Sequence, residues 1–377
     1  MKNDRTLQIK NKYEIQITKA DSLKELPDFN KLGFGQFFSD YMFVAEFEQG
    51  KGWYDFKIKP YAPFQMDPAA SVLHYGQALF EGLKAFKRPN GEVVIFRPEF
   101  NALRFKQGAE RLCMVPPPED LFVQAIHELV NLENRWIPKD KGSALYIRPT
   151  LIGTEGFLGV RPSRKYLFFV ILSPVGAYYS SGFKPVKIWV EEEFVRAAPG
   201  GLGQTKAAAN YVASLKAAEL AKINGYSQVL WLDVTHKYVE EVGTMNVFFV
   251  VGNKILTPLL DDTILPGGVR SCAIQLLKDW GYEVVEKKVS LAELQDAYDK
   301  GLLTEAFGTG TAAVITSIGD LSFTNKKWLF NENEYGPIAK RLYEEITAIQ
   351  SGTKVDKYNW IHLVSNSNST TSIGLGL

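Results

Sequence analysis

A run of short apolar segments in the second half of the chain most constrains the fold. Four segments rich in β-branched and aromatic residues follow one another closely, at 228–233, 237–241, 246–251 and 254–258. Gly252 and Asn253 are suited to the tight turn of a hairpin between the last two. Strands and helices are mixed along the chain without the regular alternation of βαβ units. The sequence therefore predicts an α+β fold rather than a doubly wound sheet.

The chain divides at a stretch rich in proline, glycine and serine. Strand-like segments precede it, together with two predicted helices near 100–112 and 119–133. Residues 174–185, PVGAYYSSGFKP, then break the pattern. A chain of 377 residues is long enough for two domains. We expect an N-terminal domain at 1–173, an interdomain loop at 174–185, a C-terminal domain at 186–365 and a disordered tail at 366–377.

Composition argues against several classes of function. Lys and Arg total 43 against 42 Asp and Glu, so no basic surface for nucleic acid is indicated. No apolar run is long enough to cross a bilayer, and the polar N-terminus lacks the apolar core of a secretory signal. The four histidines do not cluster, which argues against a metal site. Cys113 and Cys272 lie far apart, as suits the reducing cytoplasm, where we expect the protein to be located.

Lys206 stands in an unusual place for a lysine. Three glycines within 200–203 precede it, and three alanines at 207–209 open a predicted helix after it. The spacing does not match a P-loop. From the residues alone two interpretations remain: a structural lysine, or an amine that desolvation makes nucleophilic enough to form a Schiff base. Tyr211 could face the same site.

Glu241 is the second unusual position, because it closes a predicted strand just before Gly243. A carboxylate buried at that point needs a partner. Glu241 is therefore either an exposed residue at the end of a strand or a carboxylate that holds a cationic ring nitrogen.

Two glycine turns are suited to binding an anion. LPGGVR (265–270) leads into a predicted helix, where backbone amides and the helix dipole favour negative charge. FGTGTAAV (307–314) places hydroxyl groups beside exposed amides. Arg104 is either a surface arginine or a phosphate ligand. An amine, a carboxylate, a phenol, an arginine and two such turns are together the parts needed to hold pyridoxal phosphate.

Several longer motifs carry a resemblance to a known family. GGLGQTKAAANY, EEVGTMN, LPGGVR and FGTGTAA occur in this order, and so do LHYGQALFEGLKAF, FRPEFNALRF and LYIRPTLIGTEGFLGV before them. Over roughly residues 30–350 the chain resembles the fold-type IV pyridoxal-phosphate enzymes. More narrowly, it is similar to branched-chain amino acid aminotransferases of the larger, eukaryote-like subgroup. The resemblance implies a smaller N-terminal α/β domain and a larger C-terminal pseudo-barrel domain.

The resemblance implies a role in cofactor binding for each matching residue. Lys206 matches the Schiff-base lysine, Glu241 the carboxylate that pairs with the pyridine nitrogen, and Tyr211 the tyrosine near the phenolic oxygen. The phosphate-binding positions are matched by Arg104, the amides of Gly268 and Val269, and the hydroxyl of Thr311. The family usually carries a bulky residue where Gly268 stands.

The resemblance also implies a substrate site. Its side-chain pocket is matched by Phe34, Tyr75, Phe80, Tyr146, Tyr178, Thr244 and Ala312. Thr311 and Ala312 match the turn that receives the substrate α-carboxylate, and Arg148 the arginine that can receive the distal carboxylate of glutamate. Leu158 and Val160 match a loop that the partner subunit of a homodimer contributes.

The activity implied is transfer of an amino group between L-leucine, L-isoleucine or L-valine and 2-oxoglutarate, with pyridoxal 5'-phosphate as cofactor. Two alternatives belong to the same fold type: a D-amino acid aminotransferase and an aminodeoxychorismate lyase. A binding protein that has kept only the fold is a third. The intact Lys206 and Glu241 argue against this last alternative.

Overall fold

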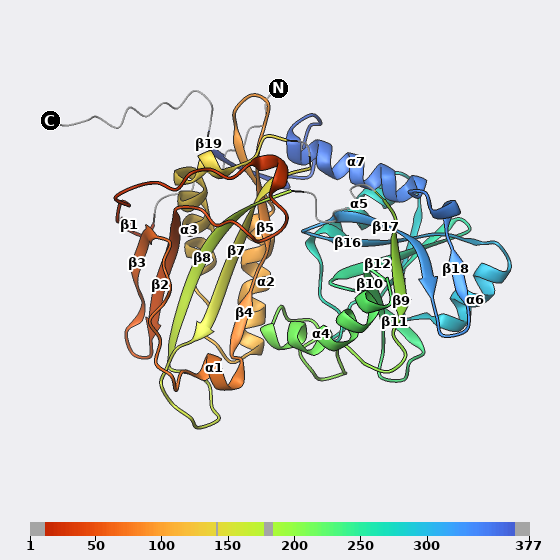
Figure 1. Ribbon diagram of the computed structural model, residues 1–377, viewed down its shortest axis with the longest axis horizontal. Helices are drawn as coiled ribbons and strands as arrows, with labels where there is room; N and C mark the ends of the chain where they lie inside the picture. Colours follow the sequence, from red (N-terminus) through yellow and green to blue (C-terminus); the bar gives the residue numbers. More distant parts are fainter. Residues whose placement is uncertain (1–11, 141, 177–183, 366–377) are drawn as a thin grey trace.

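The computed structural model describes residues 12–140, 142–176 and 184–365 (Figure 1). They form two bodies that lie side by side, each built on one large sheet with helices packed against it. The α+β fold expected from the sequence is confirmed. Among the described residues, no helix is long and apolar enough to span a bilayer.

The first body is built on a nine-stranded sheet among the described residues, in the order β1-β3-β2-β8-β7-β5-β6-β19, with β4 paired to β7. All its pairs are antiparallel except β1 with β3. The strands are β1 (Gln16–Ile17), β2 (Tyr41–Glu48), β3 (Gly52–Pro60), β4 (Ala78–Phe80), β5 (Leu83–Lys87), β6 (Val93–Phe96), β7 (Ala144–Gly153), β8 (Lys165–Val175) and β19 (Ile361–Ser365).

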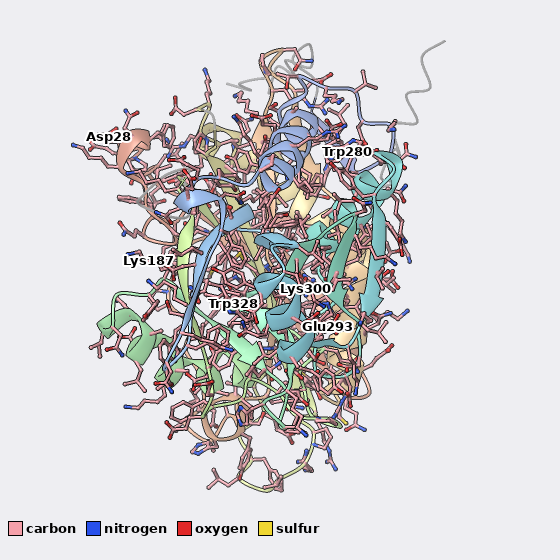
Figure 2. The ribbon with its side chains drawn as sticks, turned by 90° about the vertical axis from the view of Figure 1, so that its right-hand side faces the viewer. Asp28, Lys187, Trp280, Glu293, Lys300 and Trp328 are labelled. Carbon is pink, nitrogen blue, oxygen red and sulfur yellow. The ribbon has the colours of Figure 1, made fainter. Side chains whose placement is uncertain are left out.

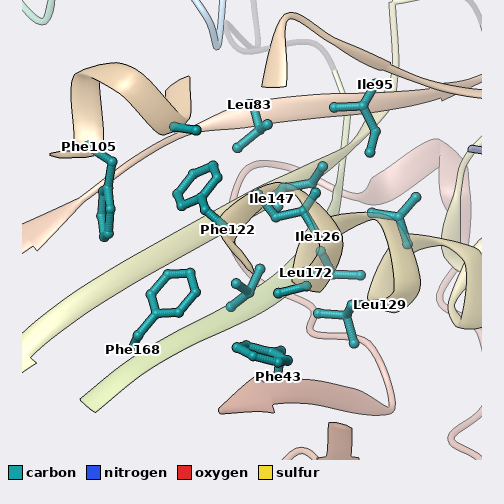
Figure 3. Close-up of a cluster of buried hydrophobic side chains, with 14 of the residues drawn as sticks. Phe43, Leu83, Ile95, Phe105, Phe122, Ile126, Leu129, Ile147, Phe168 and Leu172 are labelled. Atoms are coloured by element: carbon teal, nitrogen blue, oxygen red, sulfur yellow. The ribbon is translucent and has the colours of Figure 1, made fainter. Parts of the chain in front are cut away.

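Helices α2 (Pro98–Arg111) and α3 (Glu119–Leu132) cover one face of this sheet, close to the ranges expected. Their apolar faces meet the sheet in a cluster of aromatic rings (Figure 3). In that cluster Phe105 lies 5.2 Å from Phe122, and Phe122 stacks on Phe168 of β8 at 5.8 Å between centroids. A short helix, α1 (Ser71–Tyr75), precedes β4.

The second body contains ten strands in the order β14-β13-β12-β16-β17-β9-β10-β11-β15, with β18 on β17. A further pairing joins β11 to β12, so that β12, β16, β17, β9, β10 and β11 form a closed ring. This ring agrees with the expected pseudo-barrel. The strands are β9 (Val186–Val190), β10 (Gln228–Leu232), β11 (Tyr238–Val242), β12 (Met245–Val251), β13 (Lys254–Pro258), β14 (Glu283–Lys287), β15 (Val289–Ser290), β16 (Leu303–Gly310), β17 (Val314–Ser322) and β18 (Lys327–Leu329).

Four helices accompany the barrel: α4 (Ala208–Ile223), α5 (Gly268–Asp279), α6 (Leu291–Asp299) and α7 (Pro337–Ser351). Helix α6 packs over Trp328, whose ring stacks on Tyr298 at 5.5 Å (Figure 2). Short 3-10 turns lie at Phe29–Lys31, Asn134–Trp136 and Asn331–Asn333. The expected hairpin at Gly252 is present, with Val251 opposite Lys254 and a positive φ of 56° at the glycine.

Two boundaries differ from those expected. Strand β8 continues to Val175, so the expected interdomain loop begins inside a strand. Strand β19, which we placed in the C-terminal domain, returns to the first body and pairs with β6. It covers backbone groups that an edge strand would leave unpaired. Residues 177–183, including Tyr178, and the expected tail at 366–377 lie outside the described residues.

Candidate active site

Lys206 lies where the two bodies meet. The residue after it forms an antiparallel bridge with Leu79 of β4, and its carbonyl accepts a hydrogen bond from the Phe80 amide. Its Nζ donates to Tyr211 Oη at 2.8 Å and lies 5.1 Å from the centre of the Phe80 ring. The short turn before α4 thus directs the amine into the space between the bodies.

The charge state of this amine follows from its neighbours. Burial lowers the pKa of Lys206, but the Tyr211 oxygen and the Glu81 carboxylate outweigh burial and the opposing charge of Arg104. The pKa therefore lies above its usual value. The amine is protonated at neutral pH and must lose a proton before it can act as a nucleophile.

Glu241 is buried at the end of β11. One carboxylate oxygen accepts a hydrogen bond from the Leu265 amide at 2.8 Å, and the other lies 3.5 Å from Nε of Arg196. Burial raises the pKa of Glu241, and the Arg196 guanidinium opposes this. Glu241 shares a pocket with Tyr211 and Thr244. The buried carboxylate thus faces the space that Tyr211 borders, as a partner of a cationic ring must.

A second pocket gathers the groups expected to bind phosphate. It is lined by Arg104 of α2, Gly268 and Val269 at the start of α5, and Thr311 of the turn between β16 and β17. The free amides at the start of a helix favour an anion. The structure thus brings together four residues that lie far apart in the sequence.

Arg104 has a counter-charge of its own. Its Nε and Nη2 donate to the two oxygens of Glu81 at 2.7 and 2.8 Å, and Nη1 donates to the Pro266 carbonyl at 2.8 Å. Burial raises the pKa of Glu81, but Arg104 more than offsets this and holds it below its usual value. The paired guanidinium is held rigidly, with its charge largely balanced by Glu81.

The glycine at 268 has a structural explanation. A Cβ at this position would lie 3.1 Å from the Phe100 ring, closer than side chains normally pack. Phe100 also lies under two guanidinium groups, 4.6 Å from Arg97 and 5.3 Å from Arg104. Phe100 therefore occupies the space that a larger residue at 268 would need.

Aromatic residues and one arginine line the side of the site next to Lys206. Phe80 packs on Tyr211 at 4.7 Å, and Phe34 packs edge-on against Tyr146 at 5.0 Å. Arg148 lies over Phe80 at 4.7 Å and over Tyr146 at 5.2 Å. Its Nη2 is 3.4 Å from Tyr146 Oη, and its buried Nε has no hydrogen-bond partner. Among the described residues, no carboxylate forms an ion pair with Arg148.

Three expected pocket residues lie elsewhere. Tyr75 donates a hydrogen bond to the Leu158 carbonyl, and both residues are exposed, as is Val160 at 86%. They belong to α1 and to the loop after β7, at the lower end of the first body in Figure 1. Tyr178 falls outside the described residues, whereas Ala312 lies on the turn beside the phosphate-type pocket.

Three charged groups of the site were missed. Glu81 and Lys84 lie inside the FEGLKAF motif, which gave the resemblance but suggested no role for either. A buried carboxylate and lysine in an otherwise apolar strand region would have been a usable signal. Arg196 had no signal, because only the barrel brings it to Glu241.

Comparison with known proteins agrees with this geometry. Residues 78–320 match the family of class IV aminotransferases. A probable branched-chain-amino-acid aminotransferase of Staphylococcus epidermidis is 52% identical over 92% of this chain and 97% of its own. The chain belongs to the class IV aminotransferases, in the branched-chain-amino-acid aminotransferase family. Class IV aminotransferases are pyridoxal-phosphate enzymes.

Further relatives support the same assignment. The branched-chain-amino-acid transaminase 1 of Bacillus subtilis is 50% identical to this aminotransferase over 92% of the chain and 98% of its own length. Among solved structures, the Escherichia coli branched-chain amino acid aminotransferase has a TM-score of 0.72 at 26% identity, covering 86% of this chain and 99% of that one. A thermophile enzyme of the same name, complexed with N-(5'-phosphopyridoxyl)-L-glutamate, has a TM-score of 0.70 at 25% identity, covering 89% and 99%.

Proposed function

We propose that this aminotransferase transfers the amino group between L-leucine, L-isoleucine or L-valine and 2-oxoglutarate, with pyridoxal 5'-phosphate as cofactor. The observation that carries the proposal is the pairing of Lys206 with Tyr211, with the buried Glu241 and the Arg104 pocket beside it. The names of the relatives support the branched-chain substrates. The solved complex with N-(5'-phosphopyridoxyl)-L-glutamate supports glutamate as the second amino acid.

The residues present fit the cofactor. Arg104, the amides of Gly268 and Val269, and Thr311 would hold its phosphate, while Glu241 would hold a proton at its ring nitrogen. Thr309 Oγ1 is buried without a partner, which leaves a further hydroxyl available next to this turn. When bound, pyridoxal phosphate supplies the carbonyl group that takes up the amino group and a ring that withdraws electrons from Cα.

The remaining chemistry belongs to the side chains. Lys206 Nζ is placed to take the proton from the substrate Cα and to return it, as a general base and acid. Tyr211 Oη orients that amine. The rings of Phe34, Phe80 and Tyr146 exclude water from the aliphatic side chain of the substrate. Burying such a side chain stabilises the complex by about 1.5–3 kcal/mol.

A single-turnover experiment tests this function. The purified protein, loaded with pyridoxal phosphate, should lose its visible absorbance band when L-leucine is added and regain it with 2-oxoglutarate. D-leucine or aminodeoxychorismate should not do this. Turnover of either in place of L-leucine would support an alternative activity, and an unchanged spectrum with all of them would support a binding protein.

Replacing Arg148 by glutamine should separate the two half-reactions. The arginine contacts Phe80 and Tyr146 and has no carboxylate partner among the described residues, so its charge is available to a ligand. A charge-assisted contact is worth about 1.5–3 kcal/mol, so kcat/KM for glutamate should fall roughly 10- to 150-fold. Leucine offers no carboxylate at that point and should lose much less. A ratio of leucine to glutamate kcat/KM equal to that of the wild type would remove Arg148 from substrate selection.

The proposal includes a homodimer with shared active sites, in the cytoplasm. Phe157, Leu158 and Val160 are exposed together on one loop, and Val212 and Ile223 are exposed on α4. Apolar groups gathered on a surface in this way mark an interface. Sedimentation at assay concentration should give the mass of a dimer, and a fully active monomer would contradict the proposal. The free thiols of Cys113 and Cys272 suit a reducing compartment.

A further inference from the structure

Lys84 is a buried lysine that connects the two bodies. It lies on β5 of the first sheet with an exposed fraction of 5%. Its Nζ donates a hydrogen bond of 2.6 Å to the Ala312 carbonyl, on the turn between β16 and β17 of the barrel. It lines the phosphate-type pocket on one side and a larger cavity of about 800 Å³ on the other. Lys84 therefore sits at the wall between two open spaces.

The charge of Lys84 has no counter-charge nearby. Among the described residues no carboxylate forms an ion pair with its amine, and burial lowers its pKa to about 8. The cations Arg97 and Arg104 line the same pocket, and only Arg104 is balanced, by Glu81. A buried ammonium group without an anion is unfavourable unless a ligand supplies one.

The turn that Lys84 contacts is strained. Val314, directly after Thr311–Ala313, has a φ of +63° although it is β-branched and buried. Backbone of this kind persists only where the surrounding structure holds it in place, and it is found at ligand-binding sites. The hydrogen bond from Lys84 is one of the contacts that hold this turn.

We propose that Lys84 is a positioning residue for carboxylate binding: its ammonium group fixes the Ala312 carbonyl and so prepares the turn at 311–313 for the α-carboxylate of the substrate. This rests on the proposed function, in which that turn receives the carboxylate. The Ala312 carbonyl and the Ala313 N–H belong to one peptide group. A cation on the carbonyl polarises that group and makes its N–H a stronger donor.

Three variants separate charge from packing. Lys84→Met keeps the length of the side chain and removes its charge, and Lys84→Arg restores a cation. Lys87→Met is the matched control, because Lys87 lies on the same strand and lines the larger cavity but not the phosphate-type pocket. If Lys84→Met does not fold, Lys84→Gln takes its place, since the amide can still donate to Ala312.

Two ligands give the readout. The first is 4-methylvaleric acid, a leucine analogue without the amino group, whose Kd for the pyridoxal form is measured by spectral titration. The second is 3-methylbutylamine, which is leucine without the carboxylate, and its rate of reaction is measured in a single turnover. Lys84→Met should weaken binding of the acid about tenfold or more, as for loss of a charge-assisted contact. The rate with the amine should change less than about twofold by the same reasoning. Lys84→Arg should recover most of the affinity, and Lys87→Met should match the wild type.

An unchanged Kd for the acid in Lys84→Met would overturn the proposal. Equal losses with the acid and the amine would overturn it as well, because they would indicate a general structural role. Failure of the proposed function gives a different result, a wild-type protein that does not react with L-leucine. The titration with 4-methylvaleric acid requires no transamination and is read independently.

Discussion

Replacing Lys206 by alanine should abolish transamination between L-leucine and 2-oxoglutarate. The amine lies 2.8 Å from Tyr211 Oη at the meeting point of the two bodies, and no second lysine shares that contact among the described residues. In our proposal the same nitrogen acts first as nucleophile and then as base. Loss of a positioned general base alone costs about 10²–10⁴-fold in rate, so kcat should fall by at least about 10⁴-fold when both roles are lost.

The matched control is Lys216→Ala, which removes an exposed lysine from the same helix, α4. This variant should keep wild-type kcat and KM. Borohydride treatment of the wild-type protein with its cofactor, followed by peptide mapping, should place the phosphopyridoxyl group on the peptide that contains Lys206. A label on any other lysine would refute the assignment, as would a Lys206→Ala variant with kcat near that of the wild type.

Replacing Glu241 by glutamine should lower kcat roughly 10²–10³-fold, the effect of removing one preorganised group of about 3–4 kcal/mol at a reacting centre. The amide can still accept the hydrogen bond from the Leu265 amide, so the local structure should persist. A neutral amide cannot stabilise a protonated ring nitrogen, and the ring would then withdraw electrons poorly. The measurements are kcat by steady-state assay and bound cofactor by absorbance.

Glu240→Gln provides the comparison for this variant. Glu240 is the neighbouring buried carboxylate on β11, but it does not line the pocket that Glu241 shares with Tyr211. Burial raises its pKa to about 7, so an amide is close to its protonated form at neutral pH. Glu240→Gln should change kcat by less than a few-fold. Equal losses in the two variants would indicate a structural effect, and full activity of Glu241→Gln would remove this carboxylate from the chemistry.

The parts of the site that the sequence predicts are those encoded within a few residues. Lys206 and Tyr211 lie on one turn and the first turn of one helix, and the glycines at 265–270 open α5 directly. The strands at 246–251 and 254–258 follow from local composition and a glycine turn in the same way. Local patterns of this kind are set by backbone preference and the period of apolar residues, and both can be read in a short window.

The parts that could not be predicted depend on distant pairings. Arg196 reaches Glu241, Glu81 reaches Arg104, and Lys84 reaches Ala312 only when the two bodies have formed. No periodicity specifies such pairs, because they join different elements. The placement of β19 failed for the same reason. Its residues indicate a strand, but which edge it covers depends on where α7 delivers the chain.

The return of β19 to the first sheet also affects how the protein is made. Residues 12–176 leave the ribosome before the barrel is synthesised, but the edge of β6 can only be covered after residue 361 has emerged. Until then the nascent chain exposes a strand edge that can pair with another chain. The barrel must also form between the two pieces of the first sheet. Release of a finished, non-aggregating molecule therefore depends on its last strand, and chains that end before residue 361 should be captured by chaperones or degraded even though every residue of the candidate site is present.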